Sequence, residues 1–468
     1  MSKNSSLKIA REKLIENVKK HKDKNGDKFI SDDVPIIHRF EEKIENIDIL
    51  LWLRAQKNRV KLYWRNREGD FEAAGIGAAH RIACNGSTAI PTIVRKLQEN
   101  LKNFDSGIKY YGGFCFNPIQ PLDKIWKNFE SFQFIIPEIE IFRIREEVFL
   151  TYNLNPKYST PLINAEMEQE RVLRRFGLHS FDQDGLEIVA RIDEPNYDGW
   201  YYGIQSAFNL FSNGVLKKVV MARRTSFEFS EKVNPLLLLE KLTSQVEDSF
   251  HFYFQPHEEN AFFGASPERL YTRTGIDINT EAVAGTYQRS YDAMEDKKLE
   301  TAFLSSKKNI QEHSFVCEHI ENVLNRYCES VRKDDTLKIL KTARLQHLYR
   351  GYQAKLVRGV SDSDILSALH PTPAVGGVPT DRSLSEISKI EEFQRGWYAG
   401  PFGWIGQNSA DFAVAIRSGI MKDNWLHLYS GAGILPESDP LAEWQEIENK
   451  IGSFINILET TDDKSIKY

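Results

Sequence analysis

Cysteine is scarce in this chain, and no long apolar run interrupts it. The four cysteines among 468 residues form no CxxC pair and have no histidines at zinc-site spacing. We therefore expect reduced, mostly buried thiols, and no disulfide framework, zinc site or iron–sulfur cluster. No stretch approaches the ~18 apolar residues of a membrane helix, and the polar N-terminus lacks a signal-peptide core. The sequence therefore predicts a cytoplasmic protein without a membrane partner.

An excess of charge of one sign is also missing. The formal net charge is -5, with acidic and basic residues mixed along the chain, so no basic field favours nucleic acid. Neither GxGxxG nor GxxxxGK[ST] follows a predicted strand, which leaves nucleotide binding by such loops without support. The loop "KHKDKNGDK" at residues 20–28 lacks the glycine that an EF-hand needs at its sixth position. We expect a monomer with no nucleic-acid partner.

Apolar residues make up 41% of the chain and aromatic residues 12%, enough for one large domain or for two or three smaller ones. Between about residues 46 and 150, short β-rich runs alternate with turn residues, which predicts a large antiparallel sheet. Beyond residue 195, helices and strands follow no regular βαβ order, which predicts an α+β protein. The helices expected there and at the N-terminus span residues 5–22, 197–213, 234–246 and 295–331, with a further helix at the C-terminus. A strand is expected over residues 216–229, and two strands joined by a turn are expected over 260–273.

The C-terminal helix carries charged residues beside its apolar stripe. In "SDPLAEWQEIENKI", residues 438–451, the Asp-Pro pair is typical of a helix start. At 100° per residue, Glu443, Glu446 and Lys450 fall within an arc of roughly 60°. By spacing alone this arc is a solvated face with a Glu446–Lys450 ion pair, or else a cluster that binds a cation or a charged ligand. Glu448 points into the apolar arc, and nothing in the sequence explains it.

Other polar residues stand out only weakly when taken singly. Lys218 lies among apolar strand residues, Glu268 follows a turn, and Glu312 sits on a helix. A lone histidine such as His347 is commonly structural. Arg417 differs, because a guanidinium flanked by apolar strand residues needs an anionic partner, for example a carboxylate.

Eight ordered motifs together resemble the chorismate-utilising enzymes, and among these the isochorismate synthases most. The likeness is strong from about residue 195 to 460, and thinner upstream, where "YYGGFCFNP" resembles a glycine-rich motif of the family. The motifs are "KVVMAR" (218–223), "FFGASPERL" (262–270), "TEAVAGT" (280–286), "QEH" (311–313), "LHPTPAVGGVP" (369–379), "RGWYAGPFGW" (395–404), "AIRSG" (415–419) and "EWQEIENK" (443–450).

The resemblance implies the chorismate-binding fold, an α+β architecture of the anthranilate and aminodeoxychorismate synthase kind. Large antiparallel sheets flanked by helices would then form a single domain over residues 46–460. Its catalytic motifs would lie within residues 195–460. Residues 1–45 would form an N-terminal helical extension.

The resemblance also implies a reaction. Isochorismate synthases use Mg²⁺ and isomerise chorismate by adding water at C2 and expelling the C4 hydroxyl, which requires a base and an acid on opposite sides of the ring. By this likeness Lys218 is the base and Glu268 the acid. By the same likeness Glu312 and Glu446 bind the metal directly, and Glu443 contacts it through a water molecule. The residues implied to contact the substrate are Gly285, Thr286, His347, Tyr398, Arg417 and Lys450.

Residue identities separate this chain from some relatives. Amine-transferring members such as anthranilate synthase usually carry glutamine at the position of Lys218, so this residue favours water as the nucleophile. Aminodeoxychorismate synthases of the type with a covalent lysine have that lysine where Ala284 stands here. The family's "KDRxEH" run appears as "KNIQEH", with Asn309 and Ile310 in place of an acidic and a basic residue. We expect this helix to be supported differently.

Two other functions stay open. A salicylate synthase shares the lysine base and goes on to eliminate pyruvate, although "LHPTPAVGG" and "GWYAGPFGW" resemble isochorismate synthases more. A protein that binds chorismate without catalysis is the other alternative, although it would have no need of an acid and a base. For an isochorismate synthase, the product would enter menaquinone or siderophore biosynthesis.

Overall fold

Two large sheets organise the computed structural model, which describes residues 3–25, 35–57, 60–86, 88–157, 187–258, 260–290, 292–341 and 345–458. Within these residues one sheet has 12 strands and the other 10, and neighbouring strands pair antiparallel. The predicted α+β class with large antiparallel sheets is confirmed.

The larger sheet draws its strands from both halves of the chain. In spatial order it contains β1 (His38–Ile44), β8 (Glu147–Leu154), β7 (Ile139–Ile144), β3 (Phe71–Ile76), β2 (Lys61–Arg65), β11 (Phe250–His257), β12 (Asn260–Ser266), β21 (Ser418–Lys422), β22 (Trp425–Ile434), β10 (Lys218–Phe229) and β18 (Gly377–Val378), with β9 (Ile188–Glu194) paired to β10.

The second sheet likewise joins distant segments. Its order is β15 (Cys328–Lys333), β17 (Leu345–Leu356), β14 (Asp277–Gln288), β13 (Arg269–Thr274), β20 (Ser409–Val414), β19 (Pro401–Gly406), β5 (Lys109–Phe114), β6 (Phe132–Ile136) and β4 (His80–Cys84), with β16 (Lys338–Lys341) paired to β17.

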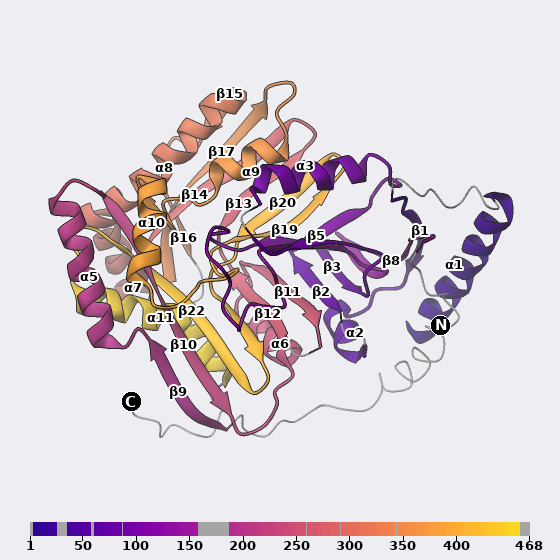
Figure 1. The fold of residues 1–468 in the computed structure, drawn as a ribbon, viewed down its shortest axis with the longest axis horizontal. Coiled ribbons are helices and arrows are strands. Elements are labelled where there is room, and N and C mark those ends of the chain that lie inside the picture. The colour runs from indigo at the N-terminus through magenta and orange to yellow at the C-terminus, as the bar shows by residue number, and fades with distance from the viewer. Residues whose placement is uncertain are drawn as a thin grey trace.

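Helices flank the two sheets (Figure 1). In the picture α1 lies beside β1 at one end of the molecule, whereas α5, α7, α8 and α10 gather at the other end, near β10 and β22. The described helices are α1 (Lys3–Asn25), α2 (Ile49–Ala55), α3 (Ile90–Leu101), α5 (Tyr197–Ser212), α6 (Pro235–Gln245), α7 (Ala293–Leu304), α8 (Lys307–Tyr327), α9 (Asp362–Leu369), α10 (Thr380–Ile390) and α11 (Pro440–Leu458).

Aromatic side chains of the two sheets meet in one core. Trp64 of the larger sheet lies 6.0 Å, between ring centroids, from Phe402 of the smaller one. A second apolar cluster joins the larger sheet to α1, α2, α6 and α11, with Leu14, Leu239 and Phe454 among its buried members. Helix α11 therefore belongs to the core through its apolar stripe, which leaves its polar residues to other contacts.

The N-terminal segment contributes a strand as well as the expected helix. Residues 38–44 form β1, which pairs with β8 along its whole length. The buried residues Leu7, Leu14 and Val18 place one face of α1 in the second apolar cluster. Within the described part of the chain, no helix is long and apolar enough to cross a membrane.

The single helix predicted over residues 295–331 is wrong. The structure has two helices, α7 and α8, and the chain enters β15 at Cys328. The reason is a capping residue: the side chain of Ser306 accepts a hydrogen bond from the amide of Asn309 and starts a new helix. This break sets the position of α8, which carries Glu312.

Candidate active site between the sheets

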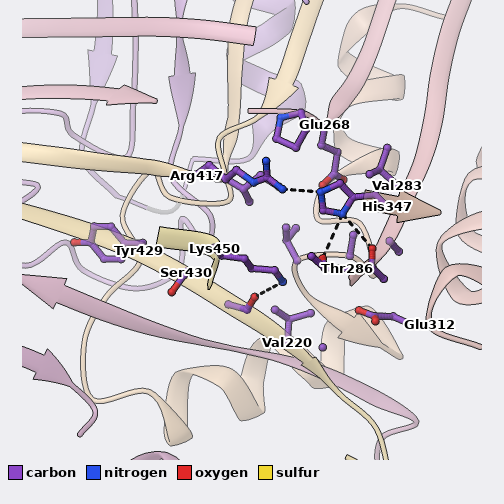
Figure 2. A pocket seen from close by; sticks show the side chains of 18 of the residues that line it. Val220, Glu268, Val283, Thr286, Glu312, His347, Arg417, Tyr429, Ser430 and Lys450 are labelled. Atoms are coloured by element: carbon purple, nitrogen blue, oxygen red, sulfur yellow. Dashed lines mark hydrogen bonds between the residues drawn. The ribbon is translucent and has the colours of Figure 1, made fainter. Parts of the chain in front are cut away.

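One cavity gathers most of the predicted site residues (Figure 2). Its walls come from β10, β14, β17, β22, α8 and α11 and from the loops before β13, β19 and β21. Three predicted residues, Lys218, Glu443 and Glu446, do not line it but contact residues around it. The predicted residues in the wall are Glu268, Gly285, Thr286, Glu312, His347, Tyr398, Arg417 and Lys450.

Lys218 and Glu312 form an ion pair behind the cavity wall. Lys218, the first residue of β10, is 0% exposed, and its Nζ lies 3.0 Å from Oε1 of Glu312 on α8. Burial alone would raise the pKa of Glu312, but Lys218, Lys450 and Lys308 together bring that pKa below its usual range. Glu312 is therefore an anion with three lysine side chains around it.

A glycine of β22 makes room for this pair. A Cβ at Gly433 would lie 2.1 Å from Oε1 of Glu312 and 2.9 Å from Cε of Lys218. No side chain fits there without moving one of the two charged groups. Sequence reasoning missed Gly433. The alternating glycines of "SGAG", residues 430–433, were the available signal, because glycine in a strand marks a close approach.

Glu268 lies in a buried turn between β12 and β13. Its backbone amide donates to the hydroxyl of Ser266, 3.2 Å away, and its carbonyl accepts from the amide of Val414. Burial raises the pKa of Glu268 to about 8, and the negative charge of Glu281 adds to that shift, while Lys218 opposes it. At neutral pH the carboxyl group is therefore protonated and able to donate a proton.

Arg417 and His347 lie next to each other in the cavity wall (Figure 2). Nη2 of Arg417 donates to Nε2 of His347 at 2.6 Å, so Nδ1 carries the ring proton and donates to the carbonyl of Gly285 at 3.1 Å. The hydroxyl of Thr286 lies 3.3 Å from the same Nδ1. Burial, the Arg417 charge and Lys450 all hold the pKa of His347 well below its ordinary value. His347 is thus a neutral side chain in a fixed tautomer.

Arg417 carries a buried charge with no carboxylate partner among the residues that the structure describes. Burial lowers the pKa of Arg417 to about 10, so the guanidinium stays charged at neutral pH. Within the described residues, no carboxylate oxygen lies within 4.0 Å of it. A buried charge of this kind is costly unless it is paired. The anionic partner that the sequence predicts for Arg417 would therefore come from a ligand bound in the cavity.

Tyr398 lies in the cavity wall and is buried. Its ring stacks on that of Tyr429, with centroids 5.4 Å apart. A Cβ at Gly431 would lie 3.1 Å from its hydroxyl oxygen. Burial raises the pKa of Tyr398, so the phenol keeps its proton and can donate a hydrogen bond to a ligand.

The charged residues of α11 contact lysines. Nζ of Lys450 lies 2.7 Å from Oε1 of Glu446 and donates to the carbonyl of Gly431 at 2.8 Å. Glu443 is 1% exposed and contacts Lys308 of α8, a partner that sequence reasoning missed. Burial raises the pKa of Glu443, with the charge of Glu446 adding to the shift and Lys308 opposing it. The Glu446–Lys450 pair expected from spacing is therefore present, beside the cavity.

The donor set suits a hard divalent cation. Glu312, Glu443 and Glu446 offer carboxylate oxygens, and Mg²⁺ in proteins usually takes one or two carboxylates and keeps several waters. Among the residues that the structure describes, no three His, Cys, Asp or Glu side chains converge tightly enough to form a complete metal cage. A cation with a partial set of protein ligands fits this arrangement, and the predicted metal roles stay predictions.

Known proteins share the whole architecture. The chain matches the family described as "Chorismate binding enzyme" over residues 25–459. It is 28% identical to isochorismate synthase MenF of Bacillus subtilis, over 90% of this chain and 93% of the relative. It is 30% identical to isochorismate synthase MenF of Escherichia coli, over 88% and 91%.

A solved structure agrees with this match. The menaquinone-specific isochorismate synthase MenF from Escherichia coli superposes with a TM-score of 0.80 at 28% identity, over 97% of this chain and 100% of that one. The predicted resemblance and the predicted chorismate-binding fold are confirmed. The chain therefore belongs to the chorismate-binding enzyme family, and it groups there with isochorismate synthases.

Proposed function

We propose that the protein is a Mg²⁺-dependent isochorismate synthase that isomerises chorismate to isochorismate. The observation that carries the proposal is the position of Glu268, whose carboxyl group is buried in the cavity wall. Burial there raises its pKa to about 8, which favours the protonated form at neutral pH. It shares its cavity with Arg417, whose charge lacks a carboxylate partner within the described residues. An acid beside a carboxylate-binding cation suits a substrate with carboxylates and a leaving hydroxyl.

In this proposal the acid and the base divide the reaction between them. Lys218, in its uncharged form, takes a proton from the water that forms the new bond at C2. Glu268 gives its proton to the C4 hydroxyl, which leaves as water while the ring double bonds shift. One water enters and one leaves, so the net reaction is an isomerisation.

Other residues orient the substrate. Arg417 binds one substrate carboxylate with the part of its fork that His347 does not occupy. The neutral His347 holds that fork in place, and its own orientation comes from the carbonyl of Gly285. Tyr398 donates a hydrogen bond to the same carboxylate, because its phenol remains protonated. Lys450 adds positive charge from α11.

Glu312 and Glu446 would hold the Mg²⁺, with Glu443 beside it through water. When bound, the ion supplies positive charge for a substrate carboxylate and competes with the lysines for these glutamates. Mg²⁺ in proteins usually keeps several water ligands. It therefore needs only part of its ligands from the three glutamates, which do not form a closed cage among the described residues.

Product analysis tests the proposal. Purified protein is incubated with chorismate and Mg²⁺, and the products are separated and identified. Isochorismate alone is the expected result, with the product available to menaquinone or siderophore biosynthesis. Salicylate together with pyruvate would identify a salicylate synthase instead. Tight chorismate binding without turnover would identify a binding protein and overturn the proposal.

A further inference from the structure

A partly buried cluster of charged side chains packs against α11, and the proposed reaction does not use it. Oε1 of Glu448 lies 2.6 Å from Nη2 of Arg191 and 2.7 Å from Nη1 of Arg223. Arg223 is 0% exposed, so its charge depends on partners within the protein. Glu448 is the residue that falls in the apolar arc of α11, and these two arginines account for its position.

A second carboxylate completes the cluster. Oδ2 of Asp193 on β9 lies 3.2 Å from Nη2 of Arg191, and its Oδ1 lies 3.5 Å from Nε of Arg223. The hydroxyl of Thr225 donates to the same Oδ1 at 2.7 Å. The charges of two arginines and two carboxylates, from β9, β10 and α11, therefore neutralise one another within this cluster. An ion group of this kind is weak evidence for net stability, which leaves a geometric role to be tested.

Aromatic contacts hold the same side of the helix. The guanidinium carbon of Arg223 lies 4.3 Å from the ring centroid of Trp444, a cation–π distance. The edge of Trp444 packs against Tyr197 of α5, at 5.5 Å and 90°. The indole of Trp200, also on α5, donates to the carbonyl of Pro440 at the start of α11. One arginine thus holds α11 through both a carboxylate and an aromatic ring.

The cluster lies on the opposite side of α11 from the cavity. Trp444 and Glu448 are four residues apart and share one face. At 100° per residue, Glu446 and Lys450 each lie roughly 160° round the helix from Glu448. A helix is rigid about its own axis over this length. Fixing the rotation of one face therefore fixes the direction of the other.

We propose that Arg223 and Glu448 are a positioning pair, which sets the rotation of α11 so that Glu446 and Lys450 face the cavity. The proposal rests on the proposed function, because Glu446 is taken there as a metal ligand and Lys450 as a substrate contact. Neither Arg223 nor Glu448 touches the reacting atoms. Their effect passes through the backbone of α11. This helix lies with β9, β10 and α5 at one end of the molecule (Figure 1).

The experiment compares Glu448→Gln with a matched control. Glu72→Gln removes a similar pair elsewhere, in which Arg143 Nη1 lies 2.6 Å from Glu72 Oε2. For Glu448→Gln we expect the Mg²⁺ concentration at half-maximal rate to rise at least fivefold, with kcat reduced less than threefold. The control should lower the melting temperature and leave the Mg²⁺ dependence unchanged. Equal Mg²⁺ dependence in the two variants overturns the positioning role.

A double variant and hydrogen exchange cover the remaining outcomes. Arg223→Gln combined with Glu448→Gln removes both charges, and for an interacting pair it should raise the Mg²⁺ requirement no further than Glu448→Gln alone. If the wild type does not turn over chorismate, the proposed function fails and amide hydrogen exchange decides the pair. Faster exchange in α11 for Glu448→Gln, but not for Glu72→Gln, then supports the pair, and unchanged exchange overturns it.

Discussion

The guanidinium of Arg417 lies 2.6 Å from Nε2 of His347, and the other ring nitrogen donates to the carbonyl of Gly285. An arginine cannot accept this hydrogen bond, so the histidine must. His347 therefore orients the guanidinium instead of transferring protons, and burial keeps its pKa well below neutrality. In the proposed reaction, proton transfer is therefore left to Lys218 and Glu268.

Arg417→Lys tests the carboxylate-binding role. A lysine offers a point charge and cannot contact both the histidine and a substrate carboxylate as the fork does. We expect the KM for chorismate to rise about 10–100-fold, as for one lost charge-assisted contact, with a smaller fall in kcat. Steady-state kinetics over a wide chorismate range measures both. Arg273→Lys is the control, because Arg273 binds Asp362 away from the cavity, and an equal KM change there would contradict the assignment.

Glu268→Gln tests the acid. The amide keeps the shape and a hydrogen bond but has no proton to give, so we expect kcat to fall about 10²–10⁴-fold. In the wild type, the rate should decline as pH rises through about 8, where Glu268 loses its proton. Activity that stays flat up to pH 9.5 would contradict this role.

The same pKa shift has a consequence for stability that needs no substrate. The folded protein keeps the Glu268 proton up to pH about 8, whereas the unfolded chain loses it near the ordinary value of 4.5. The folded state thus binds more protons between these values, and this group lowers the free energy of unfolding as pH rises through that window. Glu268→Gln should remove this contribution. Denaturant unfolding at pH 5 and pH 8.5 would show a weaker pH dependence in the variant.

Lys218→Ala tests the base, and its neighbour provides the control. Lys218 is buried and lies 3.0 Å from Glu312, whereas Lys217 is exposed on the same chain segment. We expect Lys218→Ala to lower kcat by at least about 100-fold, in line with loss of a general base. Lys217→Ala should stay within twofold of the wild type in a chorismate turnover assay. Turnover by Lys218→Ala within a few fold of the wild type would remove the base from the mechanism.

The sequence predicted the type of fold because antiparallel strands have local signatures. Alternating apolar residues and turn residues identified many strands, and the cap at Asp439 marked α11. The split between α7 and α8 was missed, although Ser306 is itself a capping residue, because most of the residues on either side of it favour helix. The pairing of β1 with β8 was beyond reach, since no short-range pattern encodes a partner 100 residues away.

Site residues could be proposed from the sequence where the chemistry requires a particular side chain. Positions that must stay empty to make room for other groups could not be recognised in this way. Arg417 attracted notice as a guanidinium among apolar strand residues, whereas Glu268 was assigned through the resemblance to the family. Gly433 contributes only the absence of a side chain, and Lys308 looked like any surface lysine until Glu443 was placed beside it. Asn309, a departure from the family motif, hydrogen-bonds the Ser306 hydroxyl at 2.9 Å and supports the start of α8.

Gly433→Ala tests the steric requirement. The new Cβ would lie 2.1 Å from Oε1 of Glu312, so the Lys218–Glu312 pair must separate or move. We expect kcat/KM to fall about 100-fold, the scale of a misplaced catalytic group. Gly452→Ala on α11 is the control, because a Cβ there meets nothing within 4 Å. It should keep activity and raise stability by about 1 kcal/mol, and a matching loss of activity in both variants would contradict the steric argument.

Removal of the cation tests the last part of the site. Treatment with a chelator should abolish turnover, and excess Mg²⁺ should restore it, because Glu312 and Glu446 then regain the ion. Glu446→Gln replaces one charged ligand by a neutral one, so we expect the half-saturating Mg²⁺ concentration to rise about 10–100-fold, the scale of one charged contact. Glu437→Gln, on the exposed turn before α11, should leave it unchanged. If Glu446→Gln keeps the wild-type Mg²⁺ dependence, Glu446 is only the ion-pair partner of Lys450, and the metal must be held by Glu312 without it.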